Sequence, residues 1–253
     1  MPYSLKGRNV LVTGGSRGLG ALVAQKFAAE GSNIAINYHS NKDAADTLAA
    51  DIASKYNVKT VVVKGDAGIT SDCINTVKSA TEQLGGLDVV ISNAGWTKMT
   101  QYGDLDATDD ADWDKCWNVN VKSALHLFKT ALPTFNANPD GGAFIITASI
   151  AGIIPSGSSI PYGVSKAALI HLMKCLASSQ GPKIRINAIV PGLLLTEWGK
   201  SFPQESIGKW EAKTILKQAP DLDDTAEMFL TLAKSSSMTG QAIRIDSGFG
   251  LLQ

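Results

Sequence analysis

The chain has 253 residues, of which 44% are hydrophobic and 18% are charged, and its formal net charge is zero. This length and apolar content can bury a sizeable core in one large α/β domain or two small ones. Balanced charge without a Lys/Arg run gives no basic surface of the kind that nucleic acid or an acidic membrane face attracts. We therefore expect neither nucleic acid nor a membrane as a partner.

The cysteine pattern and the apolar runs bear on compartment. Cys73, Cys116 and Cys175 are widely spaced and form no CxxC pair, which argues against a metal site or a disulfide framework and suits a reducing compartment. No hydrophobic signal region precedes the first strand-like run. No apolar stretch approaches the ~20 residues needed to cross a bilayer. These observations predict a soluble, cytoplasmic protein without a bound metal.

Short β-branched runs alternate with helical stretches along the whole chain. Strands are predicted at residues 9–13, 33–38, 60–64, 87–92, 143–148, 184–190 and 241–245. Helices are predicted at residues 19–30, 43–56, 71–84, 112–135, 162–178 and 223–234. Strands that are apolar on nearly every residue are buried on both faces, and their alternation with helices implies right-handed βαβ units. We predict one doubly wound, Rossmann-type α/β domain over residues 1–253, with a seven-stranded parallel sheet and helices on both faces.

The least patterned stretch is residues 193–219, which lies between the last two predicted strands. It contains aromatic residues and Pro203 but no clear helical or strand period. An insertion at the carboxyl end of a parallel strand borders the crevice where ligands bind in such sheets. We predict that this stretch covers the substrate.

A glycine-rich turn follows the first predicted strand and opens the first helix. It reads Thr13-Gly14-Gly15-Ser16-Arg17-Gly18-Leu19-Gly20. Glycines permit a tight turn and a close approach of backbone N–H groups to a pyrophosphate, and the helix N-terminus adds partial positive charge. A glycine-rich turn alone is often only a tight connection, but its position after the first strand predicts a dinucleotide site.

Tyr162 and Lys166 lie four residues apart at the start of a predicted helix, so they share a face. A tyrosine that titrates near ~10 must shift by about three units, or ~4 kcal/mol, to act near neutrality. An ammonium group ~4 Å away at an effective dielectric of ~20 contributes about that much, which predicts that Lys166 lowers the Tyr162 pKa. Ser149 ends the fifth strand, where it should meet Tyr162 in the crevice. The alternative is that such a pair lies on a solvated helix face.

Taken together, these motifs resemble the short-chain dehydrogenase/reductase family in its compact form of about 250 residues. The matching positions run in family order: Thr13–Gly20, Asp66, Asn93-Ala94-Gly95, Asn120, Ser149, Tyr162 with Lys166, Pro191-Gly192 with Thr196, and Met238-Thr239-Gly240-Gln241. One of them reads Ser-Asn-Ala-Gly where many relatives have Asn-Asn-Ala-Gly, but its defining Asn93 and Gly95 remain.

The resemblance implies four catalytic residues. Tyr162 would be the acid/base, and Lys166 would bind the nicotinamide ribose hydroxyls and lower the tyrosine pKa. Ser149 would hydrogen-bond the substrate oxygen, and Asn120 would hold a water in a proton relay. Asn118 is the rival for that last role, and either amide could be purely structural.

The resemblance also implies the cofactor contacts. Asp66 with Ala67 would hold the adenine, although Asp66 could instead simply begin a turn. The remaining expected contacts are Gly14, Ser16, Arg17, Gly18, Leu19, Gly20, His39, Ser40, Asn41, Asn93, Ala94, Gly95, Tyr162, Lys166, Pro191, Gly192, Leu194 and Thr196.

The end of the second strand bears on which cofactor is used. NAD sites usually place an acid there for the ribose 2′-OH, whereas this strand ends Tyr38-His39-Ser40-Asn41. Arg17 can reach a 2′-phosphate and Ser40 and Asn41 can donate to it; the alternative is that Arg17 points into solvent. We predict NADP(H) rather than NAD(H).

The expected cleft is apolar. It would be lined by Trp96, Met99, Ile153, Ile154, Pro155, Leu193, Leu194, Leu195, Trp198 and Phe202. This predicts reduction of an apolar or aromatic ketone or aldehyde to an alcohol. Alternatives are an NAD(H)-dependent alcohol or sugar dehydrogenase, and a non-catalytic dinucleotide sensor on the same fold. An epimerase of the extended family form would need a larger substrate domain than this length allows.

The resemblance implies a homotetramer, or a homodimer, assembled through the predicted helices 112–135 and 162–178 and the strand 241–245.

Overall fold

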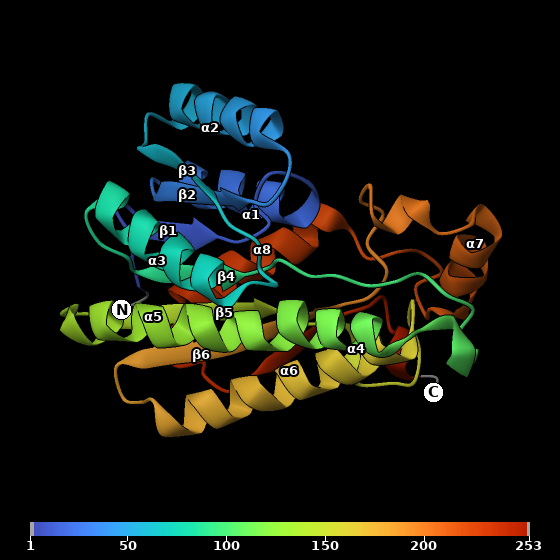
Figure 1. Cartoon of the computed structure of the whole chain (residues 1–253). Helices are drawn as coiled ribbons and strands as arrows, with labels where there is room; N and C mark the ends of the chain where they lie inside the picture. The colour runs from blue at the N-terminus through green and yellow to red at the C-terminus, as the bar shows by residue number, and fades with distance from the viewer. Residues whose placement is uncertain (1–2, 252–253) are drawn as a thin grey trace.

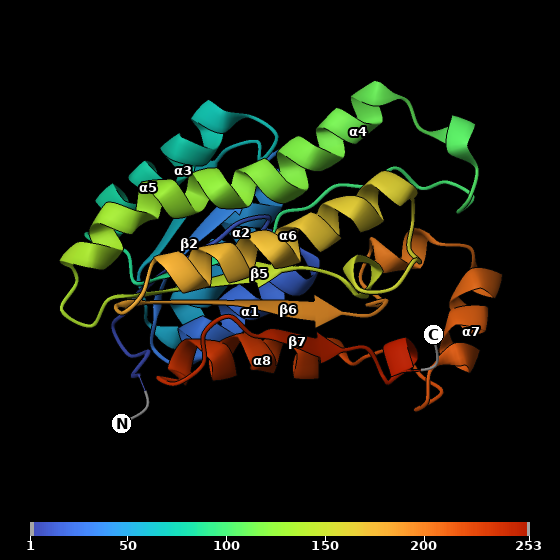
Figure 2. The same cartoon turned by 90° about the horizontal axis from the view of Figure 1, so that it is seen from below.

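The computed structural model describes residues 3–251, so the first and last two residues of the predicted domain lie outside it. A seven-stranded parallel sheet has the order β3-β2-β1-β4-β5-β6-β7. Figure 1 labels β1 to β6, and Figure 2 labels β7 beside β6. The strands are β1 Asn9–Val12, β2 Asn33–Tyr38, β3 Thr60–Lys64, β4 Val89–Ser92, β5 Gly142–Thr147, β6 Ile184–Pro191 and β7 Ala242–Ile245. The order reverses between β1 and β4, the place where open α/β sheets form a binding crevice. The predicted seven-stranded parallel sheet is confirmed.

Helices cover both faces of this sheet, as predicted (Figures 1 and 2). The α-helices are α1 Gly18–Ala29, α2 Lys42–Tyr56, α3 Thr70–Leu84, α4 Asp110–Trp117, α5 Ser123–Ala137, α6 Ile160–Ser179, α7 Gln204–Lys213 and α8 Leu222–Lys234. Short helical turns are η1 Leu105–Ala107, η3 Ile150–Gly152, η4 Gly199–Ser201 and η5 Phe249–Leu251. α1, α2 and α8 pack on one face, and α3, α5 and α6 pack on the other.

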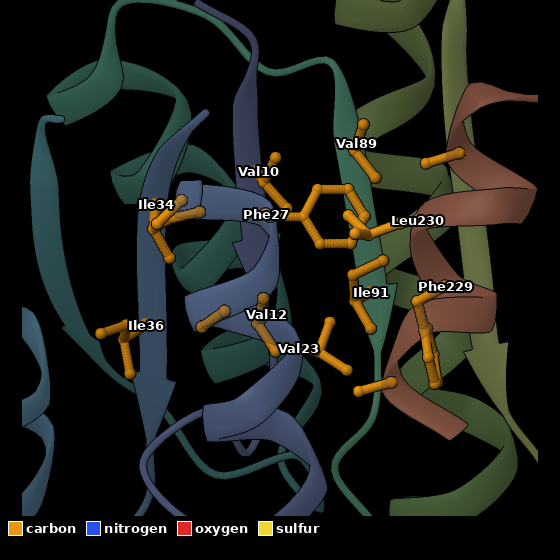
Figure 3. Close-up of a cluster of buried hydrophobic side chains, with 14 of the residues drawn as sticks. Val10, Val12, Val23, Phe27, Ile34, Ile36, Val89, Ile91, Phe229 and Leu230 are labelled. Atoms are coloured by element: carbon orange, nitrogen blue, oxygen red, sulfur yellow. The ribbon is translucent and has the colours of Figure 1, made fainter. Parts of the chain in front are cut away.

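The strand sequences explain why both faces are covered. Successive side chains of a strand point to opposite faces, so Val10 and Val12 enter the core beneath α1 and α8 while Leu11 enters the core beneath α3 and α5. Figure 3 shows the first of these cores, where Phe27 of α1 and Leu230 of α8 meet the strands. A strand with apolar residues on both sides is stable only between two helical layers.

The prediction that residues 112–135 form one uninterrupted α-helix is wrong. The π-helical stretch η2, Asn118–Lys122, separates α4 from α5. A π-turn inserts one extra residue into a turn without ending the helix. The apolar residues after it are therefore displaced by one position, and the apolar pattern of the sequence still resembles that of one helix. The effect of this π-turn is to place Asn120 on the buried side, 2% exposed.

Residues 193–219 are more regular than the sequence pattern indicates. They contain η4 and the ten-residue helix α7. Ile207 is the only buried residue of α7. A single buried residue produces no amphipathic pattern from which this helix could be predicted. Over residues 3–251, no helix is both long and apolar enough to cross a membrane.

Candidate active site

The glycine turn between β1 and α1 is tight because its neighbours leave no room for side chains. Gly14 and Gly18 have φ of +59° and +55°, a region that favours glycine. A Cβ on Gly14 would lie 3.1 Å from Cα of Ala94, and one on Gly20 would lie 2.4 Å from the Gly14 carbonyl oxygen. The turn therefore keeps backbone, not side chains, beside the N-terminus of α1.

Asn37, which the sequence reasoning missed, holds this turn in place. Its carbonyl oxygen accepts from the Gly15 N–H at 2.9 Å and its Oδ1 accepts from the Gly14 N–H at 3.2 Å. Its amide nitrogen donates to the carbonyls of Val63 and Gly65. A polar residue within an otherwise apolar buried strand is the signal that could have identified it, because a buried amide needs partners.

Asn93 joins the carboxyl ends of three strands. Its side-chain nitrogen donates to the carbonyls of Thr13 and Gly14, and its Oδ1 accepts from the Thr147 hydroxyl at 3.1 Å. The Thr13 hydroxyl accepts from the N–H groups of Asn93 and Ala94. The loop after β4 is thus tied to the glycine turn on one side and to β5 on the other.

Ser149, Tyr162 and Lys166 come together where β5 ends and α6 begins. Ser159 caps α6 by accepting from the Tyr162 N–H at 3.4 Å. Lys166 is 3% exposed, and its ammonium donates to the Thr147 carbonyl at 2.8 Å and lies 5.6 Å from the centre of the Tyr162 ring. The alternative of a solvated helix face does not hold for this pair, since the Lys166 side chain is buried.

The expectation that Lys166 brings the phenol close to neutrality is wrong. Burial raises the pKa of Tyr162 to about 12, and a hydrogen bond with Ser149 only partly opposes that rise. Burial also lowers the pKa of Lys166 to about 8, so this side chain loses its proton and its positive charge more readily than an exposed lysine does. The desolvation that both groups undergo outweighs the attraction of one charge.

Asn120, not its rival Asn118, enters the site. Its Oδ1 accepts from the Trp96 N–H at 2.8 Å, and its amide nitrogen donates to the Trp96 carbonyl and to the Ser165 hydroxyl, each at 2.9 Å. Ser165 in turn donates to the Tyr162 carbonyl at 2.7 Å. Ser165 is a second residue that sequence reasoning missed. The side chain of Asn120 therefore links the β4 loop to the first turn of α6.

At the other end of the crevice, His39 and Ser40 are exposed after β2. Asn41 caps α2 by accepting from the Ala44 N–H at 3.0 Å. Asp66 accepts from the Gly68 N–H at 2.7 Å, so it does begin a turn, and its other oxygen lies 3.4 Å from His39 Nε2. Ala67 is half-buried beside Asp66.

Arg17 does not point only into solvent. Its Nη1 lies 3.6 Å from the Glu197 carboxylate, although both side chains are largely exposed. Ser16, next to it, is half-buried, and Leu19 is buried in the core beneath α1.

The segment after β6 crosses the crevice. Pro191 is buried, and a Cβ on Gly192 would lie 2.8 Å from the Trp210 ring. Leu194 packs partly into the core beneath α1, and the Thr196 methyl lies 3.4 Å from the position that a Gly18 Cβ would take. This segment therefore contacts the glycine turn directly.

The predicted apolar wall is only partly assembled beside Tyr162. The Trp198 ring meets the Tyr162 ring edge-on with centres 6.2 Å apart. Ile154 instead belongs to a small buried cluster with Ile150 and Phe249, against which Trp210 stacks. Met99, Ile153, Leu195 and Trp198 are each 37–44% exposed. Trp96, Leu193 and Phe202 are half-buried and Pro155 is exposed.

The residues present fit a dinucleotide. The glycine turn forms a cradle that a side chain would fill, and the first N–H groups of α1 have no partners within the helix and can receive a pyrophosphate. A Cβ on Gly95 would lie 3.5 Å from Asn120 Oδ1 and 3.7 Å from the Lys166 ammonium, so Gly95 keeps an opening beside both groups.

A depression of about 500 Å³ at the opposite end of the sheet is a weaker candidate. Tyr3, Arg8, Asp140 and Arg185 line it. Arg8 pairs with Asp88 and Asp140, and Arg185 donates to three carbonyls at the end of α8. Its arginines are thus already partnered. In the part of the chain that the structure describes, no group of His, Cys, Asp and Glu is arranged to hold a metal ion.

A family model and several known proteins match nearly the whole chain. The family model described as enoyl-(acyl carrier protein) reductase matches residues 14–250. A protein assigned as ketoacyl reductase 2 of the granaticin polyketide synthase of Streptomyces violaceoruber is 35% identical over 96% of both chains. The sorbose reductase of Schizosaccharomyces pombe is 33% identical over 98% of this chain and 97% of its own.

Solved structures resemble the whole fold. A short-chain dehydrogenase from Burkholderia cenocepacia in complex with NADP superposes with a TM-score of 0.90 at 29% identity, covering 98% of this chain and 99% of its own. The NADPH-dependent 3-quinuclidinone reductase of Rhodotorula rubra has a TM-score of 0.91 at 28% identity, covering 98% and 93%.

The buried ammonium predicts a pH dependence of stability. Because the pKa of Lys166 is about 8 in the folded chain, below its ordinary value of 10.5, the unfolded chain binds more protons between these values and stability rises with pH. From pH 7 to 9.5 the wild type should gain about 2 kcal/mol of unfolding free energy relative to Lys166→Met. Urea unfolding at both pH values measures this gain.

Lys129→Met is the control, because Lys129 is an exposed lysine on α5. This variant should gain as much stability as the wild type over the same pH range. An equal gain in Lys166→Met would contradict the prediction.

Proposed function

This chain belongs to the short-chain dehydrogenase/reductase family of oxidoreductases, and we propose that it uses NADPH to reduce an apolar or aromatic ketone or aldehyde to an alcohol, reversibly. The observation that carries the proposal is the meeting of Ser149, Tyr162 and the buried Lys166 where β5 ends and α6 begins. Two hydroxyl groups at one place can donate to one oxygen, which favours a carbonyl over a carbon–carbon double bond as the reacting group.

Tyr162 is the proposed proton donor. Since the pKa of its phenol is raised to about 12, the phenol is protonated at neutral pH, as donation to a carbonyl oxygen requires. Ser149 donates a second hydrogen bond to that oxygen. When bound, the cofactor supplies the hydride. In the reverse direction the phenol must first lose its proton, so oxidation is favoured by higher pH.

Lys166 and Asn120 are proposed to support this proton transfer. With a pKa of about 8, Lys166 remains largely protonated at pH 7 and can donate to ribose hydroxyls. Asn120 is proposed to hold the water that returns a proton from Lys166 to solvent.

The cofactor is proposed to lie along the glycine turn. The N–H groups of Ser16, Gly18 and Leu19 would bind the pyrophosphate. Gly14 and Gly20 would keep the turn free of side chains, since the Gly14 N–H already donates to Asn37. The adenine would lie against Asp66, Ala67 and the 93–95 loop. The nicotinamide would contact Pro191, Gly192, Leu194 and Thr196, next to Tyr162 and Lys166.

We propose NADP(H) rather than NAD(H). The end of β2 offers His39, Ser40 and Asn41 and no acid, and Arg17 lies at the adjacent turn. A dianionic 2′-phosphate would gain a guanidinium and hydroxyl donors there without a carboxylate to repel it. The structural neighbours bound to NADP or named for NADPH support this choice.

The substrate class rests on the residues around Tyr162. Trp198 contacts the phenol ring, and Ile153 and Leu195 present exposed apolar surface. The segment 193–219, which contains α7, is proposed to cover the substrate. Relatives are named for ketoacyl, sorbose and quinuclidinone reduction, so a carbonyl is common to them while the attached group varies.

A cytoplasmic homotetramer, or a homodimer, is proposed as the working form. The three cysteines are free, as suits a reducing compartment. Trp113 and Trp117 of α4 and Val164 of α6 are 40–46% exposed, and a second copy would bury these side chains. Light scattering at micromolar concentration should give a dimer or tetramer mass, and a monomer mass would contradict the proposal.

Replacing the phenol tests the catalytic role. Tyr162→Phe removes the proton donor and should lower kcat for NADPH-dependent ketone reduction by about 10²- to 10⁴-fold. NADPH consumption with a panel of apolar, aromatic and sugar carbonyls measures this loss and identifies the substrate class. Tyr102→Phe, at an exposed tyrosine, should retain full activity. If Tyr162→Phe retained the wild-type kcat, Tyr162 would not be the proton donor.

Replacing Arg17 tests the cofactor choice. Arg17→Ala should weaken NADPH binding by about 10- to 100-fold, the value of charge-assisted hydrogen bonds, and leave NADH binding nearly unchanged. Fluorescence titration with both cofactors gives the two Kd values. Arg17→Lys should fall between, because it keeps the charge but not the guanidinium. Equal weakening of both cofactors would count against NADP preference.

A further inference from the structure

Residues 196–198 run from the glycine turn to the catalytic tyrosine. At one end the Thr196 methyl packs 3.4 Å from the position of a Gly18 Cβ, and Glu197 lies 3.6 Å from Arg17. At the other end the Trp198 ring meets the Tyr162 ring. This short segment therefore spans the crevice in which the cofactor is proposed to lie.

The backbone holds Glu197 in that place independently of the ion pair. The Thr196 hydroxyl accepts from the Gly199 N–H at 3.3 Å, and the Thr196 carbonyl accepts from the Lys200 N–H at 2.8 Å. A Cβ on Gly199 would lie only 1.8 Å from the Leu194 carbonyl oxygen, so the turn is tightly closed. These bonds thus fix the backbone on both sides of Glu197, and its carboxylate lies within 3.6 Å of Arg17.

Arg17 then has two possible anionic partners. A guanidinium binds carboxylate and phosphate oxygens through the same N–H groups, so contact with one competes with contact with the other. We propose that Glu197 is a specificity-determining residue, an internal anion that competes with the cofactor 2′-phosphate for Arg17 and so limits the affinity for NADPH. This inference rests on the proposed function, in which Arg17 binds that phosphate.

The size of the effect follows from exposure. Arg17 and Glu197 are 72% and 76% exposed at their side chains, and an exposed ion pair changes an equilibrium by only about 1.4- to 5-fold. The phosphate carries more charge than one carboxylate, so it wins the competition. Glu197 should therefore weaken NADPH binding without preventing it.

A double-mutant cycle tests the competition. Calorimetric titration of NADPH into the wild type, Glu197→Gln, Arg17→Gln and the double variant gives four Kd values. Glu197→Gln should tighten NADPH binding about 1.4- to 5-fold when Arg17 is present and have a much smaller effect in the R17Q background, where only direct repulsion of the phosphate is relieved. The gain should shrink at 0.5 M salt, because the competing charges are exposed.

The controls separate this inference from the proposed function. Glu205→Gln removes the same charge from α7, where Glu205 pairs with Lys209, and should leave the NADPH Kd unchanged. If Glu197→Gln has no effect, or has an equal effect in the R17Q background, the competition is overturned while the cofactor proposal stands. If Arg17→Gln leaves NADPH binding unchanged, the proposed role of Arg17 fails and the competition fails with it.

Discussion

The hydrogen bonds of Asn93 and Thr147 are the connection on which the site depends. Asn93 reaches the carbonyls of Thr13 and Gly14 and accepts from Thr147, so β1, β4 and β5 are joined at one edge of the sheet. The Thr147 carbonyl in turn accepts from the Lys166 ammonium. A continuous path of bonds through the side chains of Asn93, Thr147 and Lys166 thus leads from the glycine turn to α6 and fixes their spacing.

A second chain of bonds reaches the same helix from the other side. The π-turn η2 brings Asn120 inward, where it holds the Trp96 backbone and Ser165, and Ser165 holds the Tyr162 carbonyl. An extra residue in a helix costs regular hydrogen bonding, and such turns occur often at functional sites. Here the irregular stretch ties the loop after β4 to the first turn of α6.

Burial decides the electrostatics of Tyr162 and Lys166. It raises the pKa of the Tyr162 phenol and lowers the pKa of the Lys166 ammonium. Both shifts disfavour the charged forms, as expected where water is excluded. A protonated phenol is suited to giving a proton to a carbonyl oxygen, as the proposed role of Tyr162 requires.

Local patterns in the sequence predict the parallel sheet, the alternation of strands and helices, and the positions of Tyr162, Lys166 and the glycine turn, because apolar periodicity and glycine requirements are local properties. The family resemblance already favours Asn120 over Asn118, and the structure adds the π-helical stretch that buries Asn120, which a local apolar pattern does not reveal. Only the tertiary structure decided the pKa directions, the support from Asn37 and Ser165, and the approach of Glu197 to Arg17. These depend on desolvation and on contacts between residues distant in the chain, which a local pattern does not carry.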